Sequence, residues 1–395
     1  MPPVLHIPET LNTGSDGYDA PSGGSYAIDA GVVVGSDQDG FFTDQTATNL
    51  DNHGNLFGMG TGSSTGIGVD YGFAASGTVH NESDGFITGY TIGFAADGNN
   101  VTLTNDGVIN GLHDQGYIAL GSGDQLVNHG LIAGPRFAVD ENQGTGSDGG
   151  AVTNSGTIRS DDIGIDVSPQ ITVGATTIHN LAGGVIQGGT AAIEVAPSPG
   201  SIALTNEAGA TINGAIFCLS SAANIIINHG TINGAVHLGS AGDTFIGTGG
   251  TSGAIFGGAG NDSIVGGSGP DSIDGGLGDN TLTGGPGKDQ FFFDTAIGPG
   301  NIDHITDFKP HVDRIMLSQG IFTHISAALI GHALTPGLFV EGKAFTSHAQ
   351  RIEYNPANGH LVYDTNGSAH GGHPIVFATL SSHLTLHAGD FAVIA

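Results

Sequence analysis

The feature that most constrains this chain is a nine-residue repeat that fills residues 257–292 in four consecutive copies. Every copy begins with a pair of glycines and has another glycine at its fourth position. The eighth position is always apolar, and holds Ile264, Ile273, Leu282 and Phe291. A flexible linker rich in Gly and Ser would not keep an apolar residue at every ninth position. Because glycine permits the positive φ of a tight turn, each copy predicts a six-residue turn followed by a three-residue strand whose apolar residue points into a narrow core.

The sixth position of the repeat supplies side-chain oxygens. It is occupied by Asp262, Asp271, Asn280 and Asp289. Turns of equal length stack above one another, so copies one and three should form one row of oxygens and copies two and four another. A hard cation such as Ca²⁺ takes six to eight oxygen ligands at about 2.3–2.6 Å, including backbone carbonyls such as those that glycine-rich turns expose. The sequence therefore predicts several Ca²⁺ ions, with turn ligands at Gly258, Gly260, Gly267, Gly269, Gly276, Gly278, Gly285 and Gly287.

The repeat resembles the nonapeptide GGxGxDxUx of the RTX, or haemolysin-type, calcium-binding proteins. That resemblance implies a parallel β-roll with Ca²⁺ between its turns. Downstream, residues 291–322 resemble the segment that follows the repeats in RTX proteases, and residues 351–395 are similar to the C-terminal cap and uncleaved secretion signal of type I substrates. Four acids in the first of these segments are further candidate cation ligands, although each could equally be a solvated loop residue. They are Asp294, Asp303, Asp307 and Asp313.

The match to the RTX pattern has departures, among them Pro270 and Lys288 at the fifth position of copies two and four. The third copy has Asp279 and Asn280 in the reverse of the usual Asn-Asp order, so we expect a weaker site there. Upstream, "GSAGDTFIG" at residues 239–247 is interpreted as a degenerate copy with Asp243 as its ligand. Asp243 lies 19 residues before Asp262, one more than two repeats, which predicts a bulge between them.

A second, longer repeat fills the N-terminal half of the chain. Its copies share an Asn that is followed closely by Gly and then by an apolar strand. These residues are Asn52, Asn81, Asn105, Asn128, Asn154, Asn180, Asn206 and Asn228, separated by 22 to 29 residues. Two further short β-prone segments recur in each period, and three strands in about 25 residues are typical of one turn, or rung, of a parallel β-helix. Stacked rungs would place the Asn side chains in a hydrogen-bonded ladder. Architecturally, this half resembles the scaffolds of surface adhesins and polysaccharide lyases.

Charge restricts the possible partners. The chain has 37 acidic residues against 7 Lys and Arg, a formal net charge of −30. Such a chain repels nucleic acids and anionic membrane surfaces, so we expect neither as a partner and expect divalent cations to neutralise it. The N-terminus lacks the features of a Sec-type signal peptide, and no apolar stretch is long enough to insert in a membrane. With Cys218 as its one cysteine, the chain forms no internal disulfide.

The evidence for catalysis in the sequence is weak. The H-E-x-x-H motif of RTX proteases is absent, and "GSSTG" at 62–66 is expected by chance in a chain this rich in Gly and Ser. Acids in "DDIGID" (161–166) and "DEN" (140–142) could line a groove as paired carboxylates for sugar hydrolysis, or be ordinary acids at rung edges. Before residue 257 the basic side chains are Arg136 and Arg159, few for an enzyme that must neutralise a polyuronate.

These features together predict an all-β protein in four segments. The segments are an N-terminal cap or leader (1–35), a parallel β-helix (36–238), a calcium-binding β-roll (239–293) and a β-rich cap with a type I secretion signal (294–395). The expected function is that of a secreted protein that folds with calcium, is exported by type I machinery and binds a glycan or other ligand at or outside a bacterial surface. The alternative is an extracellular polysaccharide lyase, epimerase or hydrolase on the same scaffold.

Overall fold

The computed structural model describes residues 4–7, 11–13, 17–60, 66–141, 150–167, 174–197, 200–342, 344–368 and 373–395. In these ranges the chain is built from β-strands and contains no α-helix, and its three 3-10 turns are Ala327–Leu329, Pro336–Leu338 and Ala388–Asp390. It forms two compact units. The first comprises Met1–Ala222 and Gly230–Gly234, and the second Ala223–His229 and Ala235–Ala395.

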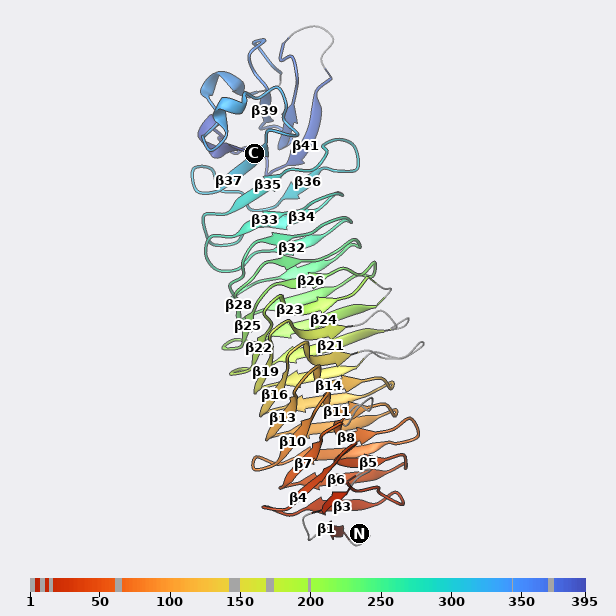
Figure 1. Ribbon diagram of the computed structural model, residues 1–395. Helices are drawn as coiled ribbons and strands as arrows, with labels where there is room; N and C mark the ends of the chain where they lie inside the picture. The colour runs from red at the N-terminus through yellow and green to blue at the C-terminus, as the bar shows by residue number, and fades with distance from the viewer. Residues whose placement is uncertain are drawn as a thin grey trace. The chain divides into compact units, whose positions relative to one another are not determined.

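The first unit is a parallel β-helix with three sheets (Figure 1). Sheet A contains β1 (Val4–Ile7), β3 (Ser25–Ile28), β6 (Thr48–Asn52), β9 (Gly77–Asn81), β12 (Val101–Asn105), β15 (Gln125–Asn128), β18 (Ala151–Asn154), β21 (Ala175–Asn180) and β24 (Ser201–Asn206). Sheet B contains β2 (Leu11–Thr13), β4 (Val33–Ser36), β7 (Asn55–Gly58), β10 (Phe86–Gly89), β13 (Val108–Gly111), β16 (Leu131–Gly134), β19 (Thr157–Ser160), β22 (Val185–Gln187), β25 (Thr211–Asn213) and β28 (Thr231–Ile232). Sheet C contains β5 (Phe41–Thr43), β8 (Ile67–Tyr71), β11 (Ile92–Ala96), β14 (Gln115–Ala119), β17 (Phe137–Glu141), β20 (Ile163–Val167), β23 (Ala191–Val195) and β26 (Ile216–Cys218).

From β3 onward each rung contributes one strand to each sheet, as the three-strand period predicted. Strands pair in parallel with the same strand of the next rung, as β12 does with β15 in sheet A. The division into four segments stays a prediction, but β1 and β3 pair in parallel before residue 36, where the helix was expected to begin. Solenoid strands therefore already occur in the expected N-terminal cap.

The core of the first unit is a set of apolar columns, one from each sheet. Sheet B contributes Ile87, Ile109, Ile132, Ile158 and Ile186, all fully buried, because alternate residues of a strand point inward and equivalent residues of successive rungs lie on top of one another. Sheet C adds a stack of aromatic rings. Tyr71, Phe94 and Tyr117 lie with ring centroids 5.9 and 5.8 Å apart.

The predicted Asn ladder is confirmed over the first unit. Asn52, Asn81, Asn105, Asn128, Asn154, Asn180 and Asn206 are fully buried and are register partners in sheet A. From Asn52 to Asn180, the Nδ2 of each donates to the Oδ1 of the next at 2.7–2.8 Å. Asn228 belongs to the second unit, where its Nδ2 donates to the Thr251 carbonyl at 3.0 Å.

Where a glycine lies two residues after a ladder Asn, it is required by the close approach of rungs. A Cβ added to Gly130 would lie 2.1 Å from the Gly107 carbonyl oxygen, and one added to Gly156 would lie 2.2 Å from the Gly130 oxygen. Real Cβ atoms do not come this close to an oxygen. The Asn-x-Gly pattern therefore combines an amide for the ladder with a residue that has no side chain at the tightest point of the turn.

The second unit is a β-roll with a cap. Strands alternate between two parallel sheets, one with β27 (Ile225–Asn228), β30 (Thr244–Ile246), β32 (Ser263–Val265), β34 (Thr281–Thr283), β36 (Asp303–Ile305) and β41 (Ile375–Thr379). The other has β29 (Val236–His237), β31 (Ile255–Phe256), β33 (Ser272–Asp274), β35 (Gln290–Phe293), β37 (Arg314–Ser318) and β42 (Phe391–Ile394). The cap adds β38 (Phe339–Glu341), β39 (Ile352–Asn355) and β40 (His360–Tyr363), with β40 antiparallel to β39 and β41. The apolar eighth residues of the repeat are fully buried between the two roll sheets, as predicted.

Replacing Asn154 by Ala should destabilise the first unit by about 2–4 kcal/mol. The buried Nδ2 of Asn128 would lose its acceptor in the ladder, and the buried Oδ1 of Asn180 would lose its donor. Asn213→Ala is the matched control. The half-exposed Asn213 accepts a surface hydrogen bond from Asn233 at 2.8 Å. Its replacement should lower the free energy of unfolding by less than about 1 kcal/mol. Urea unfolding followed by circular dichroism measures both, since the chain has no Trp. Equal losses would contradict a structural role for the ladder.

Candidate functional site

The oxygens of the sixth repeat position form two columns in the second unit. β32 pairs with β34, and β33 pairs with β35, so copies one and three share one side of the roll and copies two and four the other, as predicted. The first column contains Asn224, Asp243, Asp262, Asn280 and Asp303. The second contains Asp271, Asp289 and Asp313.

Backbone hydrogen bonds hold these carboxylates in place. The Asp243 amide donates to Asp262 Oδ1 at 2.8 Å, and the Asp271 amide donates to Asp289 Oδ1 at 3.0 Å. Each bond joins residues two repeats apart, so one oxygen of the acceptor carboxylate is used to connect successive turns. The 19-residue step from Asp243 to Asp262 keeps the same pairing, with Thr244 opposite Ser263.

The other oxygens of the columns are suited to a cation. Asp243, Asp262 and Asp289 each have a buried Oδ2 with no hydrogen-bond partner among the described residues. Burial raises the pKa of Asp243 and of Asp271 to about 6, and that of Asp303 to about 7. A buried carboxylate oxygen without a donor is costly, and a bound cation relieves that cost. The side chains of the columns, carboxylates with the amides of Asn224 and Asn280, offer the oxygen ligands that Ca²⁺ prefers.

The paired glycines make room for these carboxylates. A Cβ added to Gly257 would lie 2.5 Å from Asp262 Oδ2, and one added to Gly284 would lie 2.4 Å from Asp289 Oδ2. The first glycine of the pair thus allows the carboxylate to lie against the backbone of its own turn. Of the predicted turn glycines, Gly258, Gly260, Gly269, Gly276, Gly278 and Gly285 have left-handed φ angles, whereas Gly267 and Gly287 do not.

Three of the predicted acidic ligands lie outside the columns, and one of them, Asp294, lies beside Asp274. Asp279 is exposed, and its Oδ1 accepts from the Ile302 amide at 2.9 Å, while Asn280 takes the column position. Asp307 accepts from the Gly284 and Gly285 amides at 2.9 and 2.8 Å, so it caps the turn of the fourth copy. Asp303, by contrast, accepts from Asn280 Nδ2 at 2.8 Å and extends the first column.

Sequence reasoning missed two residues of this region. Asn224, whose backbone amide donates to Asp243 Oδ1 at 2.6 Å, begins the first column and lies 19 residues before Asp243, the spacing that could have revealed it. Asp274 occupies the ninth position of the second copy and is buried beside Asp294. Burial and then the neighbouring charge of Asp294 raise the pKa of Asp274 to about 6.

The first unit brings together acids that the sequence left as groove candidates. Asp140 and Asp166 are register partners in sheet C, and both are buried. Gln115 Nε2 donates to Asp140 Oδ2 at 2.7 Å, whereas Asp140 Oδ1 is buried without a partner in the part of the chain that the structure describes. Burial, followed by the charge of Asp166, raises the pKa of Asp140 to about 7. Arg136 lies over the Phe137 ring at 4.5 Å, next to these acids.

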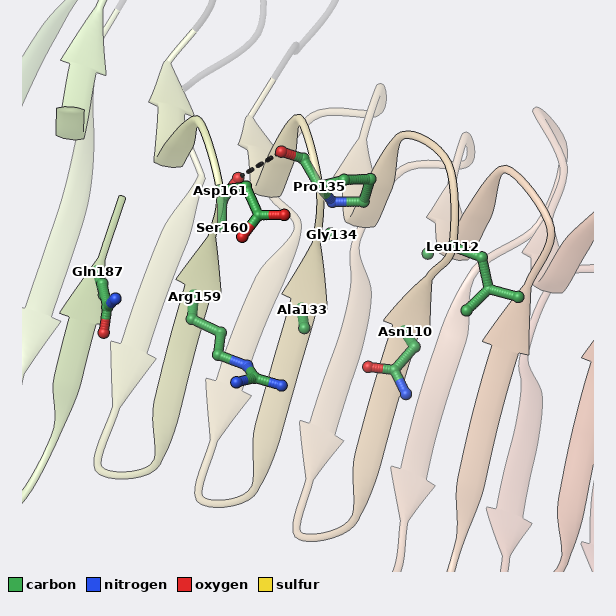
Figure 2. Close-up of a pocket in the computed structure, with 10 residues that line it drawn as sticks. Asn110, Leu112, Ala133, Gly134, Pro135, Arg159, Ser160, Asp161 and Gln187 are labelled. Carbon is green, nitrogen blue, oxygen red and sulfur yellow. Dashed lines mark hydrogen bonds between the residues drawn. The ribbon is translucent and has the colours of Figure 1, made fainter. Parts of the chain in front are cut away.

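A pocket of about 400 Å³ lies on sheet B of the first unit (Figure 2). Asn110, Arg159 and Gln187 line it from three strands, and the Arg159 side chain lies across the sheet in the direction of Ala133 and Asn110. Asp161 lies at its edge, so the "DDIGID" acids are divided between two faces of the β-helix. The "GSSTG" segment lies outside the described residues, apart from Gly66.

The fold and the two columns define a β-solenoid built to hold cations in its C-terminal unit. Residues 256–291 match the family model of the RTX calcium-binding nonapeptide repeat, in four copies. The chain therefore contains four calcium-binding repeats of the RTX type. A comparison with curated proteins found no match to this chain. Among the residues that the structure describes, no helix is both long enough and apolar enough to span a membrane.

Removing the Asp262 and Asp271 carboxylates together, by Ala substitution, should lower the number of bound Ca²⁺ ions, because one belongs to each column. Isothermal calorimetry of the full chain measures the stoichiometry. Asp279→Ala is the control, since it removes an exposed acid from a neighbouring turn and should leave the stoichiometry unchanged. Unchanged calcium binding in the double variant would contradict the assignment of the columns.

Proposed function

We propose that this protein is secreted through type I machinery, that its C-terminal unit folds when it binds calcium outside the cell, and that its β-helix then acts as a structural or adhesive element. The observation that carries the proposal is the set of buried Oδ2 atoms without donors in both columns. Asp243, Asp262, Asp271, Asp289 and Asp303 would hold the ions. Bound Ca²⁺ would supply positive charge where the fold concentrates negative charge.

Calcium binding has a large enough effect to control folding. A ligand that binds the folded state alone stabilises it by RT ln(1 + [L]/Kd), which is about 1.4 kcal/mol per site when the ligand is at ten times its Kd. Three or four such sites contribute roughly 4–6 kcal/mol, comparable with the whole stability of a small domain. In calcium-poor cytosol the stacked carboxylates repel one another. The chain would then be exported before its C-terminal unit folds, and folding outside would oppose its return.

The adhesive role rests on the first unit. Its rigid stack of rungs keeps equivalent side chains in rows, and the pocket on sheet B places Arg159 between the amides of Asn110 and Gln187. Amides and a guanidinium are the groups that bind sugar hydroxyls and carboxylates. A glycan chain at the bacterial surface is the ligand that this row of groups favours.

Hydrogen exchange of the full chain tests calcium-dependent folding segment by segment. With chelator, the backbone amides of the roll, from Asp243 to Phe293, should exchange freely, and millimolar calcium should protect them. The sheet A amides of the first unit serve as an internal control, because their Asn ladder needs no ion and should protect them in both conditions. Equal protection of the roll with and without calcium would overturn the folding switch.

A second function is favoured by the acids of sheet C. Rungs lie about 4.8 Å apart, close to the roughly 5–5.5 Å between the carboxyl groups of retaining glycosidases. The raised pKa of Asp140 would keep a proton available near neutral pH, as a general acid requires. This arrangement supports a polysaccharide-active enzyme as the alternative.

Reducing-end assays over a panel of neutral and acidic polysaccharides separate binding from catalysis. If the chain is a hydrolase, Asp140→Asn should lower its activity by at least about 100-fold, since general acid catalysis contributes that much. Asp29→Asn, which changes an exposed acid of the same unit away from the pocket, should leave the activity unchanged. If the wild-type chain binds a glycan but does not cleave it, the hydrolase alternative is excluded and the adhesive role is supported.

A further inference from the structure

The residues on either side of the Asn ladder bring histidines and carboxylates together at one edge of sheet A in the first unit. Asp51 and His53 flank Asn52, His80 and Glu82 flank Asn81, and Asp106 follows Asn105. The buried ladder fixes these backbone positions from rung to rung. The flanking side chains are half-exposed, so ions reach them from solvent.

The contacts within this group are short. His80 Nδ1 lies 2.8 Å from Glu82 Oε1, and His80 Nε2 lies 2.7 Å from Asp106 Oδ2. His53 Nε2 lies 3.9 Å from Asp51 Oδ2. In two triads, Asp51–His53–Glu82 and His80–Glu82–Asp106, one ligand atom from each residue lies within 4.8 Å of the other two. Both triads include Glu82, which connects them.

The donor chemistry differs from that of the roll. Each triad offers one imidazole nitrogen and two carboxylates, a set that suits Zn²⁺, whereas Ca²⁺ takes six to eight oxygens and no nitrogen. Three protein ligands leave a fourth tetrahedral position for water. A zinc ion would also neutralise acids that successive rungs hold near one another.

Two further residues, Asp84 and His129, contact side chains of the triads. Asp84 Oδ1 lies 3.1 Å from His53 Nδ1, and His129 Nδ1 lies 2.6 Å from Asp106 Oδ1. A carboxylate on the second nitrogen of a ligating His fixes its tautomer and ring orientation, and a hydrogen bond to a ligating carboxylate orients it.

We propose that the first unit binds zinc, or a divalent transition metal of similar chemistry, at two adjoining sites that share Glu82. The ions cross-link three rungs of sheet A, β6, β9 and the turn after β12. This metal site is independent of calcium binding by the roll.

Calorimetric titration of the full chain with Zn²⁺, in millimolar calcium so that oxygen-only sites are occupied, tests this proposal. Glu82→Gln should remove two ions from the wild-type stoichiometry, and His53→Ala and His80→Ala should remove one each. His129→Ala should weaken one site about 10- to 100-fold. His179→Ala is the control, because His179 precedes Asn180 as His80 precedes Asn81 but has Thr153 and Thr205 as its register neighbours.

Circular dichroism verifies that each variant is folded, and the two single His variants decide the question if Glu82→Gln does not fold. Absorption of bound Co²⁺ in the visible region reports the tetrahedral geometry independently of the stoichiometry. No zinc binding by the wild-type chain, or the same number of ions with the same affinity in the wild type and the Glu82 and His variants, would overturn the proposal. The cluster would then be a row of His–carboxylate ion pairs.

Discussion

Parallel stacking of rungs at a spacing of about 4.8 Å is the constraint on which this structure depends. It places every side chain directly above its equivalent in the next rung, so each column must contain residues that tolerate a copy of themselves. Amides satisfy this condition, because Asn donates with Nδ2 and accepts with Oδ1. Carboxylates do not, because two ionised Asp side chains repel. The Asn ladder of the first unit solves this stacking problem with hydrogen bonds, whereas the columns of the second unit concentrate carboxylates whose charge bound cations would neutralise.

Glycine has a related role in both units. In the β-helix, Gly130 and Gly156 lie where the backbone of the next rung comes too close for a Cβ. In the roll, Gly257 and Gly284 lie where a carboxylate oxygen takes the place that a side chain would fill. Part of the high glycine content, 71 of 395 residues, is therefore explained by dense packing between turns in the part of the chain that the structure describes.

Periodic features of the structure could be predicted from the sequence, and some contacts between rungs could not. The Asn spacing predicted the ladder, and the 18-residue step from Asp262 to Asn280 predicted their shared column. The pairing of Asp140 with Asp166 was not predicted, although the step between them equals the step from Asn128 to Asn154 in the Asn ladder. The approach of His80 to Asp106 was not predicted because the two are not register partners: His80 precedes the ladder Asn of its rung, whereas Asp106 follows that of the next. Asp279 and Asn280 are adjacent in sequence, and only the direction of each side chain distinguishes the column residue from the exposed one.

The Asn ladder has a direction. From Asn52 to Asn206 every amide donates toward the rung of higher number, so the amide dipoles align and polarise one another along the stack. The ladder begins at Asn52, because its register partner in the preceding rung is Ile28. At the other end, Asn206 Nδ2 donates to the Thr231 carbonyl. Every interior Asn makes the same two bonds, so one rung is interchangeable with another. A solenoid of this kind can therefore lengthen or shorten during evolution by duplication or loss of a whole rung, with the new neighbours bonded as the old ones were.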